Sequence, residues 1–315
     1  MKDVLNILLA PFSALYGVVL LLRHILYDEH ILPSHTPSTT TICVGNLAVG
    51  GTGKTPHVEY LVQLLSPHFR VAVLSRGYGR RTKGFMLADE HSSATTIGDE
   101  PMQIHTHFPT IPMAVCSNRI IGCKLLKKHF PDLDVIILDD AFQHRRIRCN
   151  LNILLTTYDN PFYQDHLLPW GKLRDLKLRG TKAEIIIITK CPPTLQPIDK
   201  RVTKNHLPLA AFQEVYFSCE HQEPLPTEGT PLVITGIANP KHMFEYIRQQ
   251  QPKAKCIQYP DHHRFTKRNI LLITEQAKQY DYVLTTEKDF MRLQDTHLPD
   301  ELKNNQTNAE NIVVL

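Results

Sequence analysis

The chain has 315 residues, of which 42% are hydrophobic and 21% charged. No segment is dominated by glycine, serine, glutamine or acidic residues, so the composition excludes a disordered, collagen-like or low-complexity protein. Lysine and arginine together number 35 against 31 aspartates and glutamates, which gives a formal net charge of +4. We expect no nucleic-acid partner, because proteins that bind nucleic acids concentrate basic residues on one face. The small excess is compatible with anionic small molecules or an anionic membrane surface as partners.

Seven cysteines are distributed along the chain. No two form a C-x-x-C pair, and their spacing matches no zinc or disulfide framework. We therefore expect reduced, mostly buried thiols in a cytosolic compartment.

The N-terminus carries a long apolar segment, since residues 4–22 contain no charged side chain. As a straight helix this segment extends about 28 Å, close to the roughly 30 Å of a bilayer's hydrocarbon core. Pro11 and the polar Asn6 and Ser13 weigh against a simple span, and no clear signal-peptide cleavage site follows. Three interpretations stay open: a helix in the membrane interface, which we favour, a single span, or a helix packed on the protein's own domain.

From residue 41 onward, predicted strands and helices alternate. Continuous runs of valine, isoleucine and leucine indicate buried strands, and apolar residues at helical spacing indicate the helices between them. We expect strands at residues 41–45, 71–74, 113–116, 135–138, 151–155 and 185–188, and helices at 56–66 and 119–130. This order is typical of an α/β fold with a parallel sheet and helices on both faces.

A proline-rich segment from residue 191 to 197 marks the predicted domain boundary. Beyond it we expect strands at 231–234, 257–259 and 282–285, helices at 241–250 and 267–280, and a last strand at 312–315 that joins either sheet. The chain is thereby divided into an N-terminal helix (1–30), a larger α/β domain (31–190) and a smaller α/β domain (191–315).

A glycine-rich loop follows the first predicted strand, and residues 50–55 read GGTGKT. Between a strand and a helix this sequence is typical of a P-loop, whose backbone N–H groups surround phosphate oxygens at a helix N-terminus. The full pattern has glycine where this chain has Ala48. We expect Lys54 to contact the β- and γ-phosphates and the Thr55 hydroxyl to bind Mg²⁺. The predicted nucleotide-binding residues are Ala48, Val49, Gly50, Gly51, Thr52, Gly53, Lys54 and Thr55.

The predicted strand at residues 135–138 ends in Asp139 and Asp140. Alone, such aspartates are usually solvated or cap a helix, but P-loop enzymes use a carboxylate at this position beside the P-loop strand to hold Mg²⁺. Together with Thr55 they form the predicted metal site. The sequence therefore predicts a nucleotide, ATP or GTP, with Mg²⁺.

If the nucleotide donates a phosphoryl group to an acceptor hydroxyl, as in a kinase, the site also needs a group that takes the proton of that hydroxyl. Three segments are candidates for this group. Asp99 lies in a Gly-Asp-Glu-Pro turn, and Asp261 and His262 follow Tyr-Pro in the smaller domain. Residues 285–289 (TTEKD) follow a strand, and there we expect Asp289 to cap a helix. Arginines gather where predicted strands end, at positions 76, 80, 81, 145, 146 and 174. They are candidates for phosphate contacts, although we expect at least half of those at 80, 81, 145 and 146 to lie in solvated turns.

Eight motifs occur in order along the chain: VGNLAVGGTGKTP (44–56), LSRGYGR (74–80), GDEP (98–101), DDAFQHR (139–145), LPWGKLR (168–174), ITK (188–190), PDHHRF (260–265) and TTEKD (285–289). Together they resemble the tetraacyldisaccharide 4′-kinases, the P-loop lipid A kinases of Gram-negative bacteria, over nearly the whole chain. The resemblance implies transfer of the γ-phosphoryl group of ATP to the 4′-hydroxyl of tetraacyldisaccharide 1-phosphate. It implies that residues 31–190 form the kinase core and that residues 191–315 close the nucleotide cleft.

The resemblance also implies roles for individual residues. Asp99 is the base that receives the 4′-hydroxyl proton, acting with His262, which Asp261 orients. Arg76 and Arg174 lie near the substrate or the phosphate path. Two departures stand out: Ala141 replaces a glycine, and Asp175-Leu176 replaces Glu-Pro after Arg174, so a stiff turn beside that arginine is missing.

A substrate with four acyl chains stays in the membrane, which accounts for an apolar N-terminus. We therefore expect a protein at the cytoplasmic face of the inner membrane, peripheral or monotopic rather than spanning, with no obligate protein partner. The main alternative is a membrane-associated P-loop switch ATPase without a lipid acceptor. A soluble small-molecule kinase or ligase is a second alternative.

Overall fold

The structure, a computed structural model, describes residues 2–191, 228–237, 240–294 and 312–314. By internal packing the chain divides into two compact units, which are described separately. Unit 1 comprises Met1–Arg76, Lys83–Ala88 and Phe108–Glu214, and unit 2 comprises Gly77–Thr82, Asp89–His107 and Val215–Leu315. Unit 2 thus draws two short segments from the range 31–190, while the extent of the functional domains stays a prediction. The predicted domain boundary at 191–197 lies almost wholly outside the described residues.

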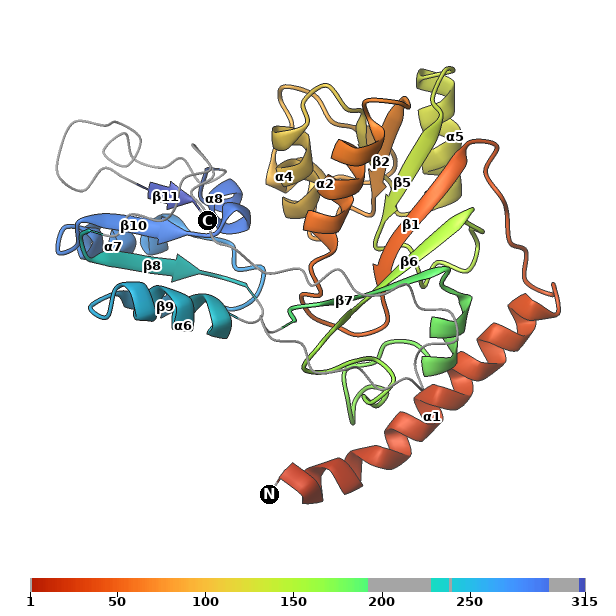
Figure 1. Cartoon of the computed structure of the whole chain (residues 1–315), viewed down its shortest axis with the longest axis horizontal. Helices are drawn as coiled ribbons and strands as arrows, with labels where there is room; N and C mark the ends of the chain where they lie inside the picture. Colours follow the sequence, from red (N-terminus) through yellow and green to blue (C-terminus); the bar gives the residue numbers. More distant parts are fainter. Residues whose placement is uncertain (1, 192–227, 238–239, 295–311, 315) are drawn as a thin grey trace. The chain divides into compact units, whose positions relative to one another are not determined.

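Unit 1 is built around a seven-stranded sheet of order β3-β4-β2-β5-β1-β6-β7 (Figure 1). Six of its strands are parallel: β1 (Thr40–Asn46), β2 (Val71–Ser75), β4 (Met113–Val115), β5 (Val135–Asp139), β6 (Leu151–Thr157) and β7 (Ile185–Thr189). The sequence predicted all six from their apolar runs. The edge strand β3 (Met86–Leu87) is antiparallel and was not predicted, because two residues are too few for a periodic pattern.

The register of the central strands brings the two predicted motifs together. Val44 of β1 is paired with Asp139 of β5, and the amide of Asp140 donates to the carbonyl of Val44 at 3.0 Å. In parallel strands the carboxyl ends share one edge of the sheet. The loop after β1, which leads into α2 (Lys54–Leu65), therefore begins beside the acidic pair.

Helix α1 (Lys2–Asp28) runs through Pro11 and lies along unit 1 (red in Figure 1). One narrow stripe, Ser13, Leu20, His24 and Tyr27, is buried at helical spacing. The remaining side is apolar and exposed, through Phe12, Leu15, Val18, Val19, Leu22, Ile25 and Leu26. By length and composition alone, Leu9–Asp28 suffices to cross a membrane. Of the three interpretations of the N-terminus, packing on the protein's own domain thus describes one stripe of the helix and leaves a broad apolar face uncovered.

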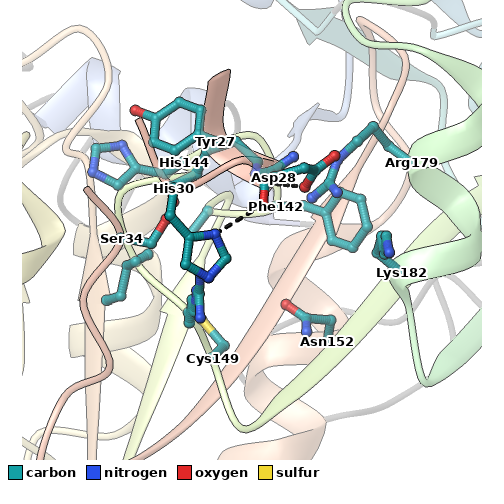
Figure 2. A pocket seen from close by; sticks show the side chains of 14 residues that line it. Tyr27, Asp28, His30, Ser34, Phe142, His144, Cys149, Asn152, Arg179 and Lys182 are labelled. Atoms are coloured by element: carbon teal, nitrogen blue, oxygen red, sulfur yellow. Dashed lines mark hydrogen bonds and ion pairs between the residues drawn. The ribbon is translucent and has the colours of Figure 1, made fainter. Parts of the chain in front are cut away.

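At the carboxyl end of α1 the chain encloses a cavity of about 320 Å³ (Figure 2). Tyr27 and Asp28 from the last turn of α1 line it together with Phe142, Cys149 and Arg179. Arg179 belongs to the short 3-10 helix η1 (Lys177–Lys182). The cavity therefore joins α1, the segment after β5 and η1.

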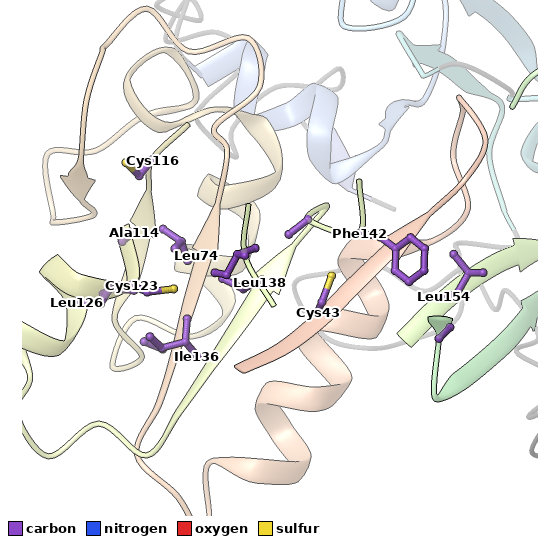
Figure 3. Close-up of a cluster of buried hydrophobic side chains, with 14 of the residues drawn as sticks. Cys43, Leu74, Ala114, Cys116, Cys123, Leu126, Ile136, Leu138, Phe142 and Leu154 are labelled. Carbon is purple, nitrogen blue, oxygen red and sulfur yellow. The ribbon is translucent and has the colours of Figure 1, made fainter. Parts of the chain in front are cut away.

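The core of unit 1 lies against the sheet (Figure 3). Cys43, Leu74, Ile136 and Leu138 project from neighbouring strands and are nearly inaccessible to solvent. Helix α5 (Arg119–His129) packs against β2 and β4, and begins where the Asn118 side chain accepts hydrogen bonds from the amides of Ile120 and Ile121. The described cysteines are free: Cys43, Cys116, Cys123 and Cys191 are buried, and Cys149 and Cys256 are partly exposed.

Unit 2 contains a parallel four-stranded sheet of order β11-β10-β8-β9. Its strands are β8 (Pro231–Thr235), β9 (Lys255–Gln258), β10 (Tyr282–Thr285) and β11 (Ile312–Val314). Its helices are α3 (Ala94–Ile97), α4 (Asp99–His107), α6 (Lys241–Gln250), α7 (Lys267–Ala277) and α8 (Glu287–Gln294). The last strand pairs with β10, so it joins this sheet and not the core sheet. The sequence did not predict α3 and α4, and it indicated α8 only through the expected helix cap at Asp289, because each helix is too short to show an apolar period.

Candidate active site

The loop between β1 and α2 has the backbone of a phosphate-binding turn. Gly53 caps α2 in the left-handed conformation with φ 81°, and Gly50 has φ 112°, so both positions favour glycine. Lys54 and Thr55 begin the helix, where free backbone N–H groups and the helix dipole favour an anion. Thr55 is buried, and the Lys54 ammonium lies 3.7 Å from the Asp140 carboxylate.

The first residues of the predicted nucleotide loop contact another segment of unit 1. Ala48 forms a bridge with Leu173, and the amide of Val49 donates to the Lys172 carbonyl at 2.8 Å. The Thr52 hydroxyl accepts from the Asn46 side chain at 2.9 Å. These contacts fasten the start of the loop to segment 168–174, whereas Gly50 and Gly51 have open space around their Cα atoms.

The acidic pair is divided between two environments. Asp139 is 1% exposed, and its Oδ2 accepts from the Ser75 hydroxyl at 3.0 Å. Asp140 lies one residue further on with φ 49°. Burial raises the pKa of Asp140, but the charges of Lys54 and Arg174 outweigh it and leave the pKa below its usual value. Asp140 is therefore ionised at neutral pH.

Arg174 lies at this site even though the expected Glu-Pro turn is missing. Its guanidinium binds both oxygens of Asp140, and its Nη2 donates to Asn46 Oδ1 at 2.5 Å. A distant part of the chain holds the turn instead: the Asp175 carboxylate is fully buried and lies 2.5 Å from Nε2 of His24 on α1. The hydroxyl of Tyr16, also on α1, donates to the Arg174 carbonyl at 2.9 Å.

Two further residues belong to this site and were not assigned from the sequence. Asn46 joins Arg174 to Thr52, as described above. Arg119 is 2% exposed and donates to the carbonyls of Cys116 and Asp139 at 2.8 and 3.0 Å. Burial lowers its pKa, and the two aspartates oppose this shift. Arg119 follows β4, so its position just beyond the end of a strand was the one sequence feature that could have indicated a role at this site. Arg76 is exposed at the end of β2, and its charge further lowers the pKa of Arg119.

The predicted metal ligands have suitable chemistry. Mg²⁺ prefers oxygen ligands and usually retains water and phosphate oxygens in nucleotide sites, so few protein ligands suffice. The Thr55 hydroxyl at the start of α2 and the ionised Asp140 beside Lys54 supply such oxygens, with Asp139 adjacent. The described residues contain no group of three or more His, Cys, Asp or Glu side chains arranged to hold a metal. The donor set fits a magnesium–nucleotide site and not an all-protein metal cage.

The second predicted cluster lies within unit 2. Asp99 begins α4, and its Oδ2 lies 3.1 Å from Nδ1 of His262. Arg292 of α8 donates from Nε to the same carboxylate oxygen at 2.7 Å, and its Nη2 lies 3.2 Å from Nδ1 of His262. Asp261 is exposed, and no hydrogen bond joins it to His262 in the described part of unit 2. The structure thus brings Asp99 and His262 together. Arg292, and not Asp261 as expected, is the residue that contacts His262 beside Asp99.

Arg292 is held in turn by Asp289, which is fully buried. Nη1 of Arg292 donates to Asp289 Oδ1 at 2.7 Å and to the Gly236 carbonyl at 3.1 Å. Asp289 Oδ2 also accepts from the Thr235 and Thr286 hydroxyls, at 2.9 and 2.6 Å. The amide of Asp289 donates to the Thr286 hydroxyl at 3.3 Å, so Thr286, and not Asp289 as expected, caps the start of α8. Asp289 lies in the first turn of that helix and fixes Arg292.

The electrostatics of this cluster favour an ionised Asp99. Burial raises its pKa, but the hydrogen bonds from His262 and Arg292 and the charge of Arg292 lower it further than burial raises it. Asp99 is therefore a carboxylate at neutral pH and can accept a proton. No local pattern marks Arg292, since it is one arginine on a short helix.

Comparison with known proteins identifies the family. A model of the family described as tetraacyldisaccharide-1-P 4′-kinase (LpxK) matches residues 5–313. A tetraacyldisaccharide 4′-kinase of Porphyromonas gingivalis is 43% identical over 322 residues, which cover 95% of this chain and 90% of that protein. One from Flavobacterium johnsoniae is 39% identical and covers 95% and 91%, respectively.

Among solved structures, LpxK from Aquifex aeolicus in complex with ATP is similar with a TM-score of 0.70 and 29% identity. The alignment covers 92% of this chain and 90% of that one. The parallel sheet with its P-loop and the ATP-bound relative agree with the expected fold and nucleotide. The chain therefore belongs to the tetraacyldisaccharide-1-phosphate 4′-kinase family of ATP-dependent kinases.

Proposed function

We propose that this chain transfers the γ-phosphoryl group of ATP to the 4′-hydroxyl of tetraacyldisaccharide 1-phosphate, a step of lipid A biosynthesis. Family membership supports this acceptor over the alternative of a switch ATPase. The observation that carries the proposal is the ionised Asp99 held against His262. An ATPase that only switches needs no second proton acceptor of this kind.

The nucleotide is assigned to the P-loop of unit 1. Backbone N–H groups of residues 50–55 and the Lys54 ammonium surround its phosphates, and Arg174 adds a guanidinium suited to phosphate oxygens. Thr55 and Asp140 would hold Mg²⁺, with Asp139 beside them. When bound, the ion neutralises charge on the β- and γ-phosphates. In the free protein, Asp140 holds the cationic ends of both Lys54 and Arg174.

The proton acceptor is assigned to Asp99 of unit 2. As the 4′-oxygen bonds to the γ-phosphorus, the bond from that phosphorus to the bridging oxygen of ADP breaks, and the 4′-hydroxyl proton passes to Asp99 or His262. His262 shares this proton load through Nδ1. Arg292 keeps Asp99 ionised, and we assign it a positioning role. Arg76 is assigned to the substrate path, since it is exposed at a strand end.

The enzyme is tested with purified full-length protein in detergent, ATP, Mg²⁺ and tetraacyldisaccharide 1-phosphate. Mass spectrometry is expected to show one added phosphoryl group on the distal sugar. ATP hydrolysis with an unchanged lipid would instead favour the switch ATPase.

A pair of variants tests the assignment of the proton acceptor. Asp99→Ala is expected to abolish transfer and keep ATP binding. Asp261→Asn is expected to retain most activity, because Asp261 is exposed and forms no hydrogen bond with His262 within the described residues. Near-normal turnover of Asp99→Ala would remove Asp99 from the chemistry.

We also propose that the exposed apolar face of α1 attaches the protein to the cytoplasmic surface of the inner membrane. The support is the composition of that face: Leu15, Val19 and Leu22 are 65%, 56% and 56% exposed and lie one helical turn apart. Replacing all three with glutamine is expected to abolish flotation with lipid vesicles and leave the fold intact. Leu271→Gln with Leu272→Gln, two exposed leucines of unit 2, serves as the matched control. Unchanged flotation of the α1 variant would refute this attachment.

A further inference from the structure

The cavity at the carboxyl end of α1 is strongly basic. Four cationic side chains line it, Arg145, Arg148, Arg179 and Lys182, against the single lining carboxylate of Asp28. None of its lining residues belongs to the loop between β1 and α2. The cavity is therefore distinct from the nucleotide site.

Asp28 compensates only part of this positive charge, although Arg145, Arg179 and Lys182 all lower the pKa of its carboxyl group. Arg145 is paired, since its Nη2 donates to Asp28 at 2.6 Å. Nη2 of Arg148 lies 3.4 Å from Nε2 of His30, a side chain without a carboxylate. Within the described part of the chain, neither Arg148 nor Arg179 nor Lys182 forms an ion pair. The carboxylate of Glu184 lies beside the rim, but the backbone and side-chain nitrogens of Asn152 bind it.

Arg179 is partly buried. Its guanidinium lies 5.8 Å from the centre of the Phe142 ring, and its Nε is buried without a hydrogen-bond partner among the described residues. Burial and, next, the charge of Arg145 lower the pKa of Arg179, and the carboxylates of Asp175 and Asp28 only partly oppose this shift. Buried donors are normally satisfied, so a cavity with unpaired guanidinium groups is suited to an oxyanion ligand. Figure 2 shows Arg179 and Lys182 on the same side of the cavity.

We propose that this cavity binds a phosphate group, as a second anion site separate from the P-loop. Guanidinium groups bind phosphate oxygens by paired hydrogen bonds, and Lys182 adds a point charge. Exposed Ile25 and Leu26 lie within the last turn of α1 beside the cavity residues Tyr27 and Asp28. Phosphate-bearing lipids carry their phosphates just outside the apolar layer that such side chains enter. The phosphate comes from a lipid headgroup or from free phosphate, and the experiment distinguishes the two.

Cys149 provides a reporter, because this free thiol lines the cavity. Full-length protein is treated with iodoacetamide, and peptide mass spectrometry follows alkylation of Cys149 and of the partly exposed Cys256 in unit 2. The probes are inorganic phosphate, vesicles of phosphatidylcholine alone, and vesicles containing phosphatidylglycerol. A bound phosphate group is expected to slow alkylation of Cys149 several-fold and to leave Cys256 unchanged.

Variants make the result specific. Arg148→Gln with Lys182→Gln removes two exposed cations of the cavity and is expected to abolish the protection of Cys149. Lys124→Gln with Lys128→Gln removes two exposed cations of α5 and is expected to keep it. Lys54→Ala is also expected to keep it, because the P-loop is not involved. Thermal unfolding checks that all variants fold.

The outcomes separate the sources of the phosphate. Protection by phosphatidylglycerol vesicles but not by inorganic phosphate identifies a lipid headgroup, and protection by inorganic phosphate identifies a free anion; either supports the site. If no probe slows Cys149 relative to Cys256, or if the Arg148/Lys182 variant stays protected, the inference is overturned. The alkylation experiment does not measure phosphoryl transfer, so a negative result for the phosphate site leaves the proposed kinase activity unaffected.

Discussion

Replacing Arg292 with methionine removes a charge that two carboxylates share. Its side chain is 6% exposed and makes charge-assisted hydrogen bonds to Asp99 and Asp289, both at 2.7 Å. Removing one partner of a buried ion pair costs about 3–5 kcal/mol. Asp289 retains hydrogen bonds from Thr235 and Thr286, so we expect the lower end, about 3 kcal/mol or a fall in Tm of roughly 10 °C.

The pH dependence of activity separates a positioning role of Arg292 from a merely structural one. Arg292 lowers the pKa of Asp99, so the pKa of Asp99 rises when the guanidinium is absent. If Asp99 must be ionised to accept the proton, the acid limb of the kcat/KM profile moves to higher pH. Arg292→Lys keeps a charge without the fork and is expected to show a smaller shift.

The assay measures thermal unfolding and kcat/KM from about pH 3.5 to 9 for the unchanged protein and the methionine and lysine variants, so that the acid limb of a group with a pKa below its usual value is included. Arg268→Met, which removes an exposed arginine of α7, is the matched control and is expected to leave both readouts unchanged. A lower Tm with an unmoved acid limb would refute the reasoning. Arg292 would then support only the fold, and Asp99 would not be the titrating group.

Three further predictions concern single positions. Lys54→Ala is expected to weaken ATP binding at least tenfold, because an ammonium near the phosphates is lost, and an unchanged affinity in calorimetry would contradict the P-loop assignment. Gly98→Ala is expected to lower the free energy of unfolding by about 3 kcal/mol, since φ is 99° and a Cβ would lie 2.8 Å from the Tyr78 carbonyl oxygen. The control Gly79→Ala, with φ 76° and open space around it, is expected to lower it by about 1 kcal/mol. Denaturant unfolding measures both. His144 has its pKa lowered to about 4 by burial and by nearby arginines. Below about pH 6.5 the unfolded chain binds a proton at His144, which the folded chain binds only near pH 4. The stability of the fold is therefore unaffected by His144 above pH 6.5 and falls as the pH drops from there toward 4. His144→Gln is expected to flatten the dependence of Tm on pH in this window, and an unaltered slope would exclude His144 as its source.

The sheet was predictable because burial on both faces imposes an unbroken apolar run on each parallel strand. The segment from Val135 to Leu138, for example, has no competing interpretation once helices flank it. Strand β3 and helices α3 and α4 were missed, and α8 was indicated without bounds, because tertiary contacts and not local periodicity fix elements of a few residues. The N-terminal helix predicted over residues 1–30 corresponds to α1 (Lys2–Asp28), which runs through Pro11.

The site was predictable where a residue type must recur at fixed spacing. Lys54 and Thr55 follow glycines that only a phosphate loop requires, and Asp140 ends a strand beside it. Asn46 and Arg292 were not found, because Arg174 and Asp99, the site residues they bind, lie more than a hundred residues away from them in the chain. No local pattern contains that information.

The altered turn after Arg174 shows how a distant element replaces a local device, and it changes how α1 must be tested. Removing residues 1–30 deletes the membrane-facing side chains, but it also removes His24 from Asp175 and Tyr16 from the Arg174 carbonyl. An uncompensated buried carboxylate at Asp175 is costly and shifts the turn that presents Arg174 to Asp140. The truncated protein is therefore expected to lose affinity for ATP as well as for vesicles, whereas the glutamine variant of the exposed face loses only the vesicles. If the truncated protein binds ATP like the full chain, α1 does not hold Arg174 in place.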